Sequence, residues 1–232
     1  MMALLGFSAR LLALGAAGVL SVAAASDQVV IGFSPTAVSP DSRAPNTSLA
    51  RGMFLIAGRG LGDPNFSRSV VLLLEYDATG ALGLIVNRPT AVQLTELLPE
   101  VEELKDRDDL VYLGGPVSKN HIVVLMRTAQ HPPQAGRVFA DTYVSSNMET
   151  LKQAVSMSRD GGSFRAFIGY AGWGPGQLDQ EVSRGDWHIA PADEAMVFDR
   201  ASGEIWPELI EKHSGQWVRG DRVRLLMASV HP

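Results

Sequence analysis

The stretch Ser69–Val86, SVVLLLEYDATGALGLIV, decides the fold class of this chain. Its first half is a continuous aliphatic run of strand length, which is typical of a strand buried on both faces. Asp77-Ala78-Thr79-Gly80 has the composition of a turn, and its glycine can adopt a positive φ. The aliphatic run Ala81–Val86 then returns and stops before Pro89. The pattern predicts a β-hairpin over residues 69–86.

Further strands and helices are predicted on both sides of this hairpin. Short apolar runs predict strands at Met53–Ala57, Phe164–Tyr170 and Trp187–Ala190, and a second hairpin that pairs Leu110–Leu113 with His121–Arg127 across Gly114-Gly115-Pro116. Helical spacing predicts helices at Gln93–Leu104 (broken by Pro99), from a Ser146 capping box to about Arg159, and at Leu178–Ser183, Glu194–Phe198 and Trp206–His213. The run Val223–Met227 fits a closing strand or a helix end equally well. Hairpin strands with interspersed helices and few βαβ units favour an α+β fold.

Composition limits the classes of function. The chain has 232 residues, enough for one domain and a sizeable core. It has no cysteine, which excludes thiol nucleophiles, thiolate metal sites and disulfides. With 20 Lys and Arg against 25 Asp and Glu, the net charge is -5, which makes nucleic acid an unfavourable partner.

The N-terminal residues have the layout of an export signal. Residues 1–25 carry a single charge, Arg10, before an uncharged apolar run that ends in small residues at Ala23 and Ala25. This layout predicts a secretory signal peptide, with no transmembrane span in the mature chain and an exported, periplasmic location. A cytoplasmic location follows if residues 1–25 are not a signal. Residues 26–50 have the Pro, Ser and Thr content of a flexible linker, so the folded domain is expected at residues 51–232.

No catalytic residue, metal site or cofactor is predicted. The five histidines form no i, i+4 or H-x-H pair, and the chain has no G-x-S-x-G nucleophile motif. The glycine-rich segment Gly169–Gln177, GYAGWGPGQ, comes nearest to a ligand loop, because it joins a strand to a helix whose first amides could bind an anion. It lacks the lysine and the spacing of known phosphate loops. The alternative is a tight structural turn, with Pro175 at the first helical position and Trp173 as a hydrophobic peg.

Polar residues flank the first hairpin. Asp63 and Arg68 precede its first strand, and Asn87 and Arg88 follow its second. These residues can converge at one end of the sheet, either as a buried Asp–Arg pair that fixes loops or as a binding site.

Five motifs together resemble one protein family. They are FLIAGRGLGDPNFSRSVVLLLEY (54–76), GALGLIVNRP (80–89), YLGGPV (112–117), GYAGWGPGQLDQE (169–181) and WHIAPAD (187–193). In this order they resemble the bacterial YqgE/AlgH family, also called UPF0301 or DUF179, over roughly residues 51–226. The resemblance implies a single compact α+β domain with a bifurcated, partly barrel-like, mainly antiparallel β-sheet flanked by helices. It implies no established enzymatic activity, although some members carry a transcriptional-regulator label.

Three functional hypotheses follow. The first is a non-enzymatic binding or regulatory protein with an unidentified protein or small-molecule partner. The second is a small-anion or nucleotide-binding protein, or an enzyme, that uses the turn Gly172–Gln177 with Arg68 or Arg88. The third is an interaction scaffold in which Trp173 contacts a partner. The candidate binding residues, taken from the family motifs, are Asp63, Arg68, Asn87, Arg88, Gly115, Gly172, Trp173, Gly174, Gly176 and Gln177.

Overall fold

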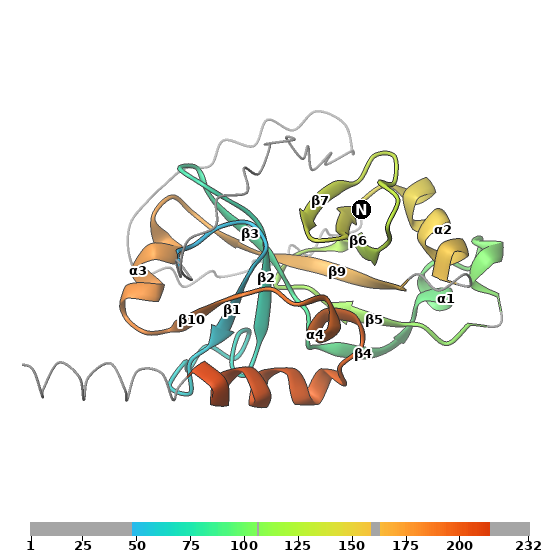
Figure 1. Cartoon of the computed structure of the whole chain (residues 1–232). Helices are drawn as coiled ribbons and strands as arrows, with labels where there is room; N and C mark the ends of the chain where they lie inside the picture. The colour runs from blue at the N-terminus through green and yellow to red at the C-terminus, as the bar shows by residue number, and fades with distance from the viewer. Residues whose placement is uncertain (1–47, 106, 159–162, 214–232) are drawn as a thin grey trace, which may run out of the picture. The chain divides into compact units, whose positions relative to one another are not determined.

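A computed structural model describes residues 48–105, 107–158 and 163–213. The predicted signal peptide, nearly all of the predicted linker and the run 223–227 lie outside these residues, so those expectations remain predictions. The described part is a mainly antiparallel, curled β-sheet with helices around it (Figure 1). The α+β prediction is therefore confirmed.

The first half of the sheet is built on the predicted hairpin. Strand β2 (Val70–Asp77) pairs antiparallel with β3 (Gly80–Ile85), and the register shifts by a bulge between Leu73 and Glu75. Strand β1 (Met53–Ala57) pairs with the other edge of β2, and β10 (Trp187–Pro191) pairs with β1. Residues 70–74 are all buried, as their continuous aliphatic pattern predicts.

The long strand β9 (Ser163–Trp173) joins the two halves of the sheet. The end of β9 nearest Trp173 pairs with β3, and its first half pairs with β6 (Val117–Arg127) on one edge and with β5 (Leu110–Leu113) on the other. Because β3 and β5 follow one another along the same edge of β9, the sheet divides there. This division is the bifurcation that the resemblance implies.

The predicted second hairpin is wrong. Strands β5 and β6 do not pair with each other, because β9 lies between them, parallel to β5 and antiparallel to β6. The segment Gly114-Gly115 is the place where the chain passes closely against β9. A Cβ on Gly115 would lie 2.1 Å from the carbonyl carbon of Tyr170, so only glycine fits.

The remaining strands lie at the margins of the second half. Strand β4 (Pro89–Gln93) pairs with β5, and β8 (Thr142–Ser145) pairs with β6 and with β7 (Gly136–Phe139). The sequence did not predict β4, β7 or β8. All three are four or five residues long, which is too short for a clear alternating pattern.

The helices agree with prediction in position but not in every cap. The break at Pro99 is confirmed, since α1 (Leu94–Leu97) ends before it and the 3-10 helix η1 (Glu102–Leu104) follows. Helix α2 (Met148–Met157) is capped by Asn147 and not by Ser146, because the Asn147 side chain accepts hydrogen bonds from the amides of residues 149 and 150.

Three further helical segments complete the described part. Helix α3 (Gln177–Ser183) begins after Gly176, whose φ of 69° is left-handed, so Pro175 does not take the first helical position as predicted. Strand β9 also runs to Trp173, which shortens the predicted turn to residues 174–176. Helix α4 (Glu194–Phe198) and a helical segment over residues 202–213 follow β10.

Two hydrophobic clusters hold the described residues together. One lies on β1, β2 and β3, and the helical segment 202–213 covers it with Ile205, Trp206, Leu209 and Ile210. The other lies between β5, β6, β9 and the helices α1, η1 and α2. The predicted binding residues lie around the first cluster.

Candidate functional site

Loop 58–69, between β1 and β2, is held in place by Asn87 and Arg88, which lie between β3 and β4. The Asn87 side chain accepts a hydrogen bond from the Val70 amide (2.9 Å) and donates one to the Arg68 carbonyl (3.0 Å). The Arg88 guanidinium donates to the carbonyls of Asn65 (2.6 Å) and Ser67 (3.1 Å). The polar residues that flank the hairpin therefore do meet at one end of the sheet.

The predicted Asp–Arg pair is not formed. Asp63 is exposed, its carboxylate accepts from the Asn65 amide (2.8 Å), and it makes no ion pair within 4.0 Å in the part of the chain that the structure describes. Partial burial lowers the pKa of Arg88, and the nearby Asp63 carboxylate acts in the opposite direction. Arg88 thus fixes the loop through backbone carbonyls instead of through a carboxylate.

Arg68 adopts a strained backbone conformation. Its φ is 56°, in the left-handed region that non-glycine residues seldom occupy. The adjacent Ser69 is fully buried and its hydroxyl donates to the Phe66 carbonyl (2.7 Å), while Asn87 bonds the Arg68 carbonyl itself. Such a conformation costs about 1–3 kcal/mol, and it persists because these surrounding contacts hold the backbone in place.

Phe66 connects the loop to two tryptophans. Its ring stacks on Trp173 with a centroid distance of 5.9 Å and meets the edge of Trp187 at 5.6 Å. The two indoles contact each other edge to face at 6.1 Å. Trp173 is only 6% exposed, so it belongs to the core and its ring is not available to a partner, contrary to the scaffold hypothesis.

Glu181 on α3 is the polar centre of this cluster, and sequence reasoning did not single it out. One carboxylate oxygen accepts hydrogen bonds from the indole N–H groups of both Trp173 and Trp187, each at 2.9 Å. The other accepts from the Gln177 side chain at 2.9 Å. The sequence feature that could have identified Glu181 is its i, i+4 spacing from Gln177 on the helix that follows Trp173.

Two amides of the glycine-rich turn, those of Gly174 and Gln177, bond within the turn. The Gln177 side-chain oxygen accepts from the Gly174 amide (3.1 Å), and the Gln177 amide donates to the Gly174 carbonyl (3.1 Å). Gly172 is part of β9 and pairs with Leu82 of β3. Gly176 supplies the left-handed residue that starts α3. These contacts favour the structural alternative for the turn over an anion loop.

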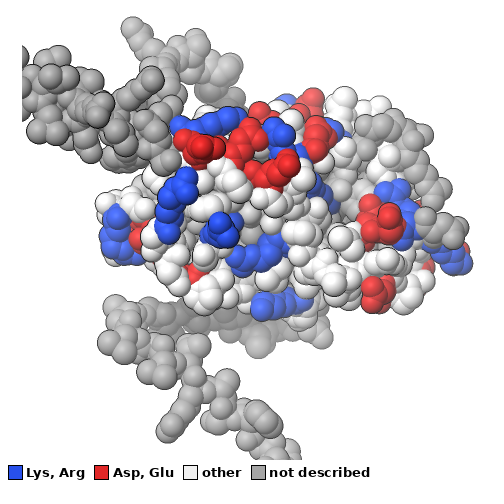
Figure 2. All heavy atoms as spheres, turned by 90° about the horizontal axis from the view of Figure 1, so that it is seen from below, with Lys and Arg blue, Asp and Glu red and all other residues white. Residues whose placement is uncertain are grey.

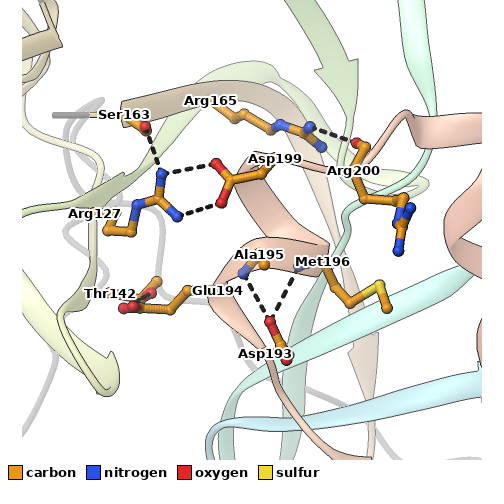
Figure 3. Close-up of polar contacts among 10 residues, drawn as sticks. All are labelled: Arg127, Thr142, Ser163, Arg165, Asp193, Glu194, Ala195, Met196, Asp199 and Arg200. Carbon is orange, nitrogen blue, oxygen red and sulfur yellow. Dashed lines mark hydrogen bonds and ion pairs between the residues drawn. The ribbon is translucent and has the colours of Figure 1, made fainter. Parts of the chain in front are cut away.

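A separate polar network ties α4 to the second half of the sheet (Figure 3). Arg127 of β6 forms a bidentate pair with Asp199 (2.7 and 2.8 Å) and also donates to Ser163. Glu194 accepts from the Asp141 amide and the Thr142 hydroxyl, and the motif residue Asp193 caps α4. The hydrogen bonds from Arg127 lower the pKa of Asp199. Apart from the Asp193 cap, the partners are far apart in sequence, so no local pattern predicts the rest of this network.

In the described ranges, no three His, Asp or Glu side chains are grouped so that they could hold a metal ion. None of the described helices combines the length and apolar character that a membrane crossing needs. A cavity of about 470 Å³ lies between α2 and residues 130–133, lined in part by His131, Glu149 and Lys152. None of the predicted binding residues lines it.

The fold and the braced loop define a class of protein: an α+β domain with a divided antiparallel sheet in which motif residues from several segments hold one surface loop. The family model described as AlgH-like (DUF179) matches residues 54–218. The chain therefore belongs to the AlgH-like family, and the resemblance inferred from its motifs is confirmed.

Curated relatives and solved structures agree with this assignment. A UPF0301 protein of Anaeromyxobacter dehalogenans is 35% identical over 168 residues, 68% of this chain and 85% of the relative. A UPF0301 protein of Streptomyces coelicolor is 32% identical over 169 residues, which are 71% of this chain and 86% of the relative. The solution structure of the AlgH protein from Pseudomonas aeruginosa matches with a TM-score of 0.61 and 27% identity, covering 76% of this chain and 93% of that one. The crystal structure of a Corynebacterium diphtheriae protein matches with a TM-score of 0.60 and 28% identity, covering 72% of this chain and 88% of that one.

Proposed function

We propose that this protein has a binding or regulatory role without catalysis, and that loop 58–69 forms its binding surface. The observation that carries the proposal is the strained, exposed loop that motif residues brace from three directions: Asn87 and Arg88 after β3, Trp173 at the end of β9, and Trp187 on β10. A loop already held in one conformation loses less entropy on binding, which favours affinity.

The chemistry around the loop supports binding over catalysis. Asn87, Arg88, Gln177 and Glu181 all direct their polar atoms to backbone groups, indoles or one another. A general base or a nucleophile needs an atom available to a substrate. The net charge of -5 makes direct regulation by DNA contact the less favourable form of a regulatory role.

Site-directed photo-crosslinking in cells tests the binding surface. A photoreactive side chain replaces Gly62, where a Cβ meets nothing within 4 Å, and in a matched variant it replaces Gln153, exposed on α2. We expect a recurrent adduct from position 62 and none from position 153, with the bound molecule chemically unchanged by mass spectrometry. Adducts from position 153 alone, or a partner recovered in chemically altered form, would contradict the proposal.

We also propose that residues 1–25 direct export, because of their basic, apolar and small-residue order. Cell fractionation followed by N-terminal sequencing is expected to recover a mature chain that starts at Ser26 in the periplasm. An intact Met1 in the cytoplasm would overturn this proposal and restore the option of a direct regulator of genes. The binding surface does not depend on this result.

A further inference from the structure

The described basic side chains differ in whether a carboxylate forms an ion pair with them. Most described Lys and Arg residues have a carboxylate oxygen within 4.0 Å. Within residues 48–213, outside the gaps at 106 and 159–162, those without one are Arg59, Arg68, Arg88, Lys119 and Arg165. All of these except Lys119 surround loop 58–69 and the end of β3, and we call these four the arginine cluster.

The members of the cluster are connected through shared neighbours. The guanidinium carbons of Arg59 and Arg68 lie 5.9 and 5.3 Å from the ring centroid of the same indole, Trp206. Arg165 donates to the carbonyls of Val86 (3.2 Å) and Arg200 (3.3 Å). Val86 directly precedes Asn87 and Arg88, which hold the loop.

Two members of the cluster are bonded to backbone carbonyls, and in the described part the other two make only cation–π contacts. Arg88 and Arg165 are half-buried and bonded to backbone carbonyls, and Arg165 also lies 4.7 Å from the ring centroid of Tyr112. Arg59 and Arg68 are exposed, and in the described part their guanidinium groups are engaged only with the Trp206 ring. A cation–π contact is weak at an exposed site, so these two can turn onto an anion while the other two maintain the positive potential.

The nearby acidic groups do not neutralise the cluster. The carboxylates of Asp63 and Asp199 act to raise the pKa of Arg88 and Arg165, respectively, but both lie beyond ion-pair distance from these arginines. Asp199 is already paired with Arg127. Arg200 forms ion pairs with Glu204 and Glu208. Figure 2, which views the molecule from below, shows basic side chains spread across the middle of this face and mixed acidic and basic groups at its upper, right and left margins.

We propose that the arginine cluster binds a small molecule that carries a diphosphate group. Guanidinium groups match phosphate oxygens in charge and in planar, two-pronged geometry. Arg59 and Arg68 lie beside the same indole, so a ligand with two linked anionic groups can engage both guanidinium groups at once. The inference rests on the proposed function, since it names the ligand class for loop 58–69. It places the anion on side chains and not on the turn Gly172–Gln177.

Calorimetry on the full chain with sodium pyrophosphate as the probe tests the inference. At low salt we expect binding that weakens as salt is raised, is tighter than for inorganic phosphate, and is tighter still than for succinate. Arg59→Gln and Arg68→Gln are each expected to weaken it at least about fivefold. Lys119→Gln removes the same charge from β6, beside Gly169, and is expected to change it less than about twofold. Unchanged circular dichroism and Tm establish that each variant is folded.

Three results would overturn the inference: no binding at about 10 mM pyrophosphate, an equal loss in Lys119→Gln, or preference for a short DNA duplex or anionic lipid vesicles over pyrophosphate. The crosslinking result separates the two proposals. Adducts from position 62 without pyrophosphate binding would contradict the diphosphate inference alone. Pyrophosphate binding that depends on the arginines, without any adduct from position 62, would contradict only the proposal of a partner-binding loop.

Discussion

Replacing Gly115 with alanine is expected to lower the free energy of unfolding by about 4 kcal/mol or to prevent folding altogether. The added Cβ would lie 2.1 Å from the Tyr170 carbonyl carbon, 2.2 Å from its oxygen and 2.4 Å from the Ala171 nitrogen. All three atoms belong to the backbone of β9, so no side-chain rotation can relieve the collision. The strand would have to move at the point where the sheet divides. Urea denaturation followed by circular dichroism measures the effect.

Gly62→Ala is the matched control for this prediction. It is the same chemical change in an exposed loop, and its Cβ meets nothing within 4 Å. We expect a change within about 0.5 kcal/mol, because the alanine also restricts the unfolded chain slightly. Similar stability of the two variants would mean that β9 does not pass against Gly115 as described.

Replacing Glu181 with alanine is expected to cost about 3 kcal/mol. The variant leaves the buried indole N–H groups of Trp173 and Trp187 without their acceptor, and Gln177 loses its partner as well. An unsatisfied buried donor costs more than the net value of its hydrogen bond, which is why the loss is large for one surface helix residue. Thermal or urea unfolding gives the stability, and near-ultraviolet circular dichroism reports the tryptophan packing.

Glu181→Gln separates the charge of the carboxylate from its role as an acceptor, because it keeps the side-chain volume and one acceptor oxygen. Its amide oxygen can still accept from an indole, although without the charge that strengthens both bonds. We therefore expect about 1 kcal/mol of destabilisation with the near-ultraviolet spectrum largely preserved. Equal losses for the two variants would show that the carboxylate matters through its charge and not as a shared acceptor.

These two predictions concern one assembly of motif residues. Phe66 lies between the tryptophans that Glu181 orients, so α3 and loop 58–69 depend on each other although about 110 residues separate them in the chain. Asn87 and Arg88 hold the same loop from the other side. Residues from several family motifs thus hold one exposed loop, and this loop carries Arg59 and Arg68 of the proposed ligand site.

Local pattern was sufficient where the physics is local. The aliphatic runs and the Asp-Ala-Thr-Gly turn of residues 69–86 specify a hairpin, because two apolar strands joined by a tight turn pair with each other through local contacts alone. Pro99 interrupts its helix whatever surrounds it. The meeting of Asn87 and Arg88 with residues 65–68 was also predictable, because the hairpin register places the residues before β2 beside those after β3.

Only the tertiary structure decided which distant segments meet. Gly114-Gly115-Pro116 has the composition of a hairpin turn, yet the same glycines serve a close crossing of β9, and composition does not distinguish these two uses. The shared carboxylate of Glu181 and the uncompensated arginines depend on which partners arrive from elsewhere in the chain. Periodicity along a chain reports which face of an element is buried, whereas side-chain partners are chosen by packing between elements, and that information is not local.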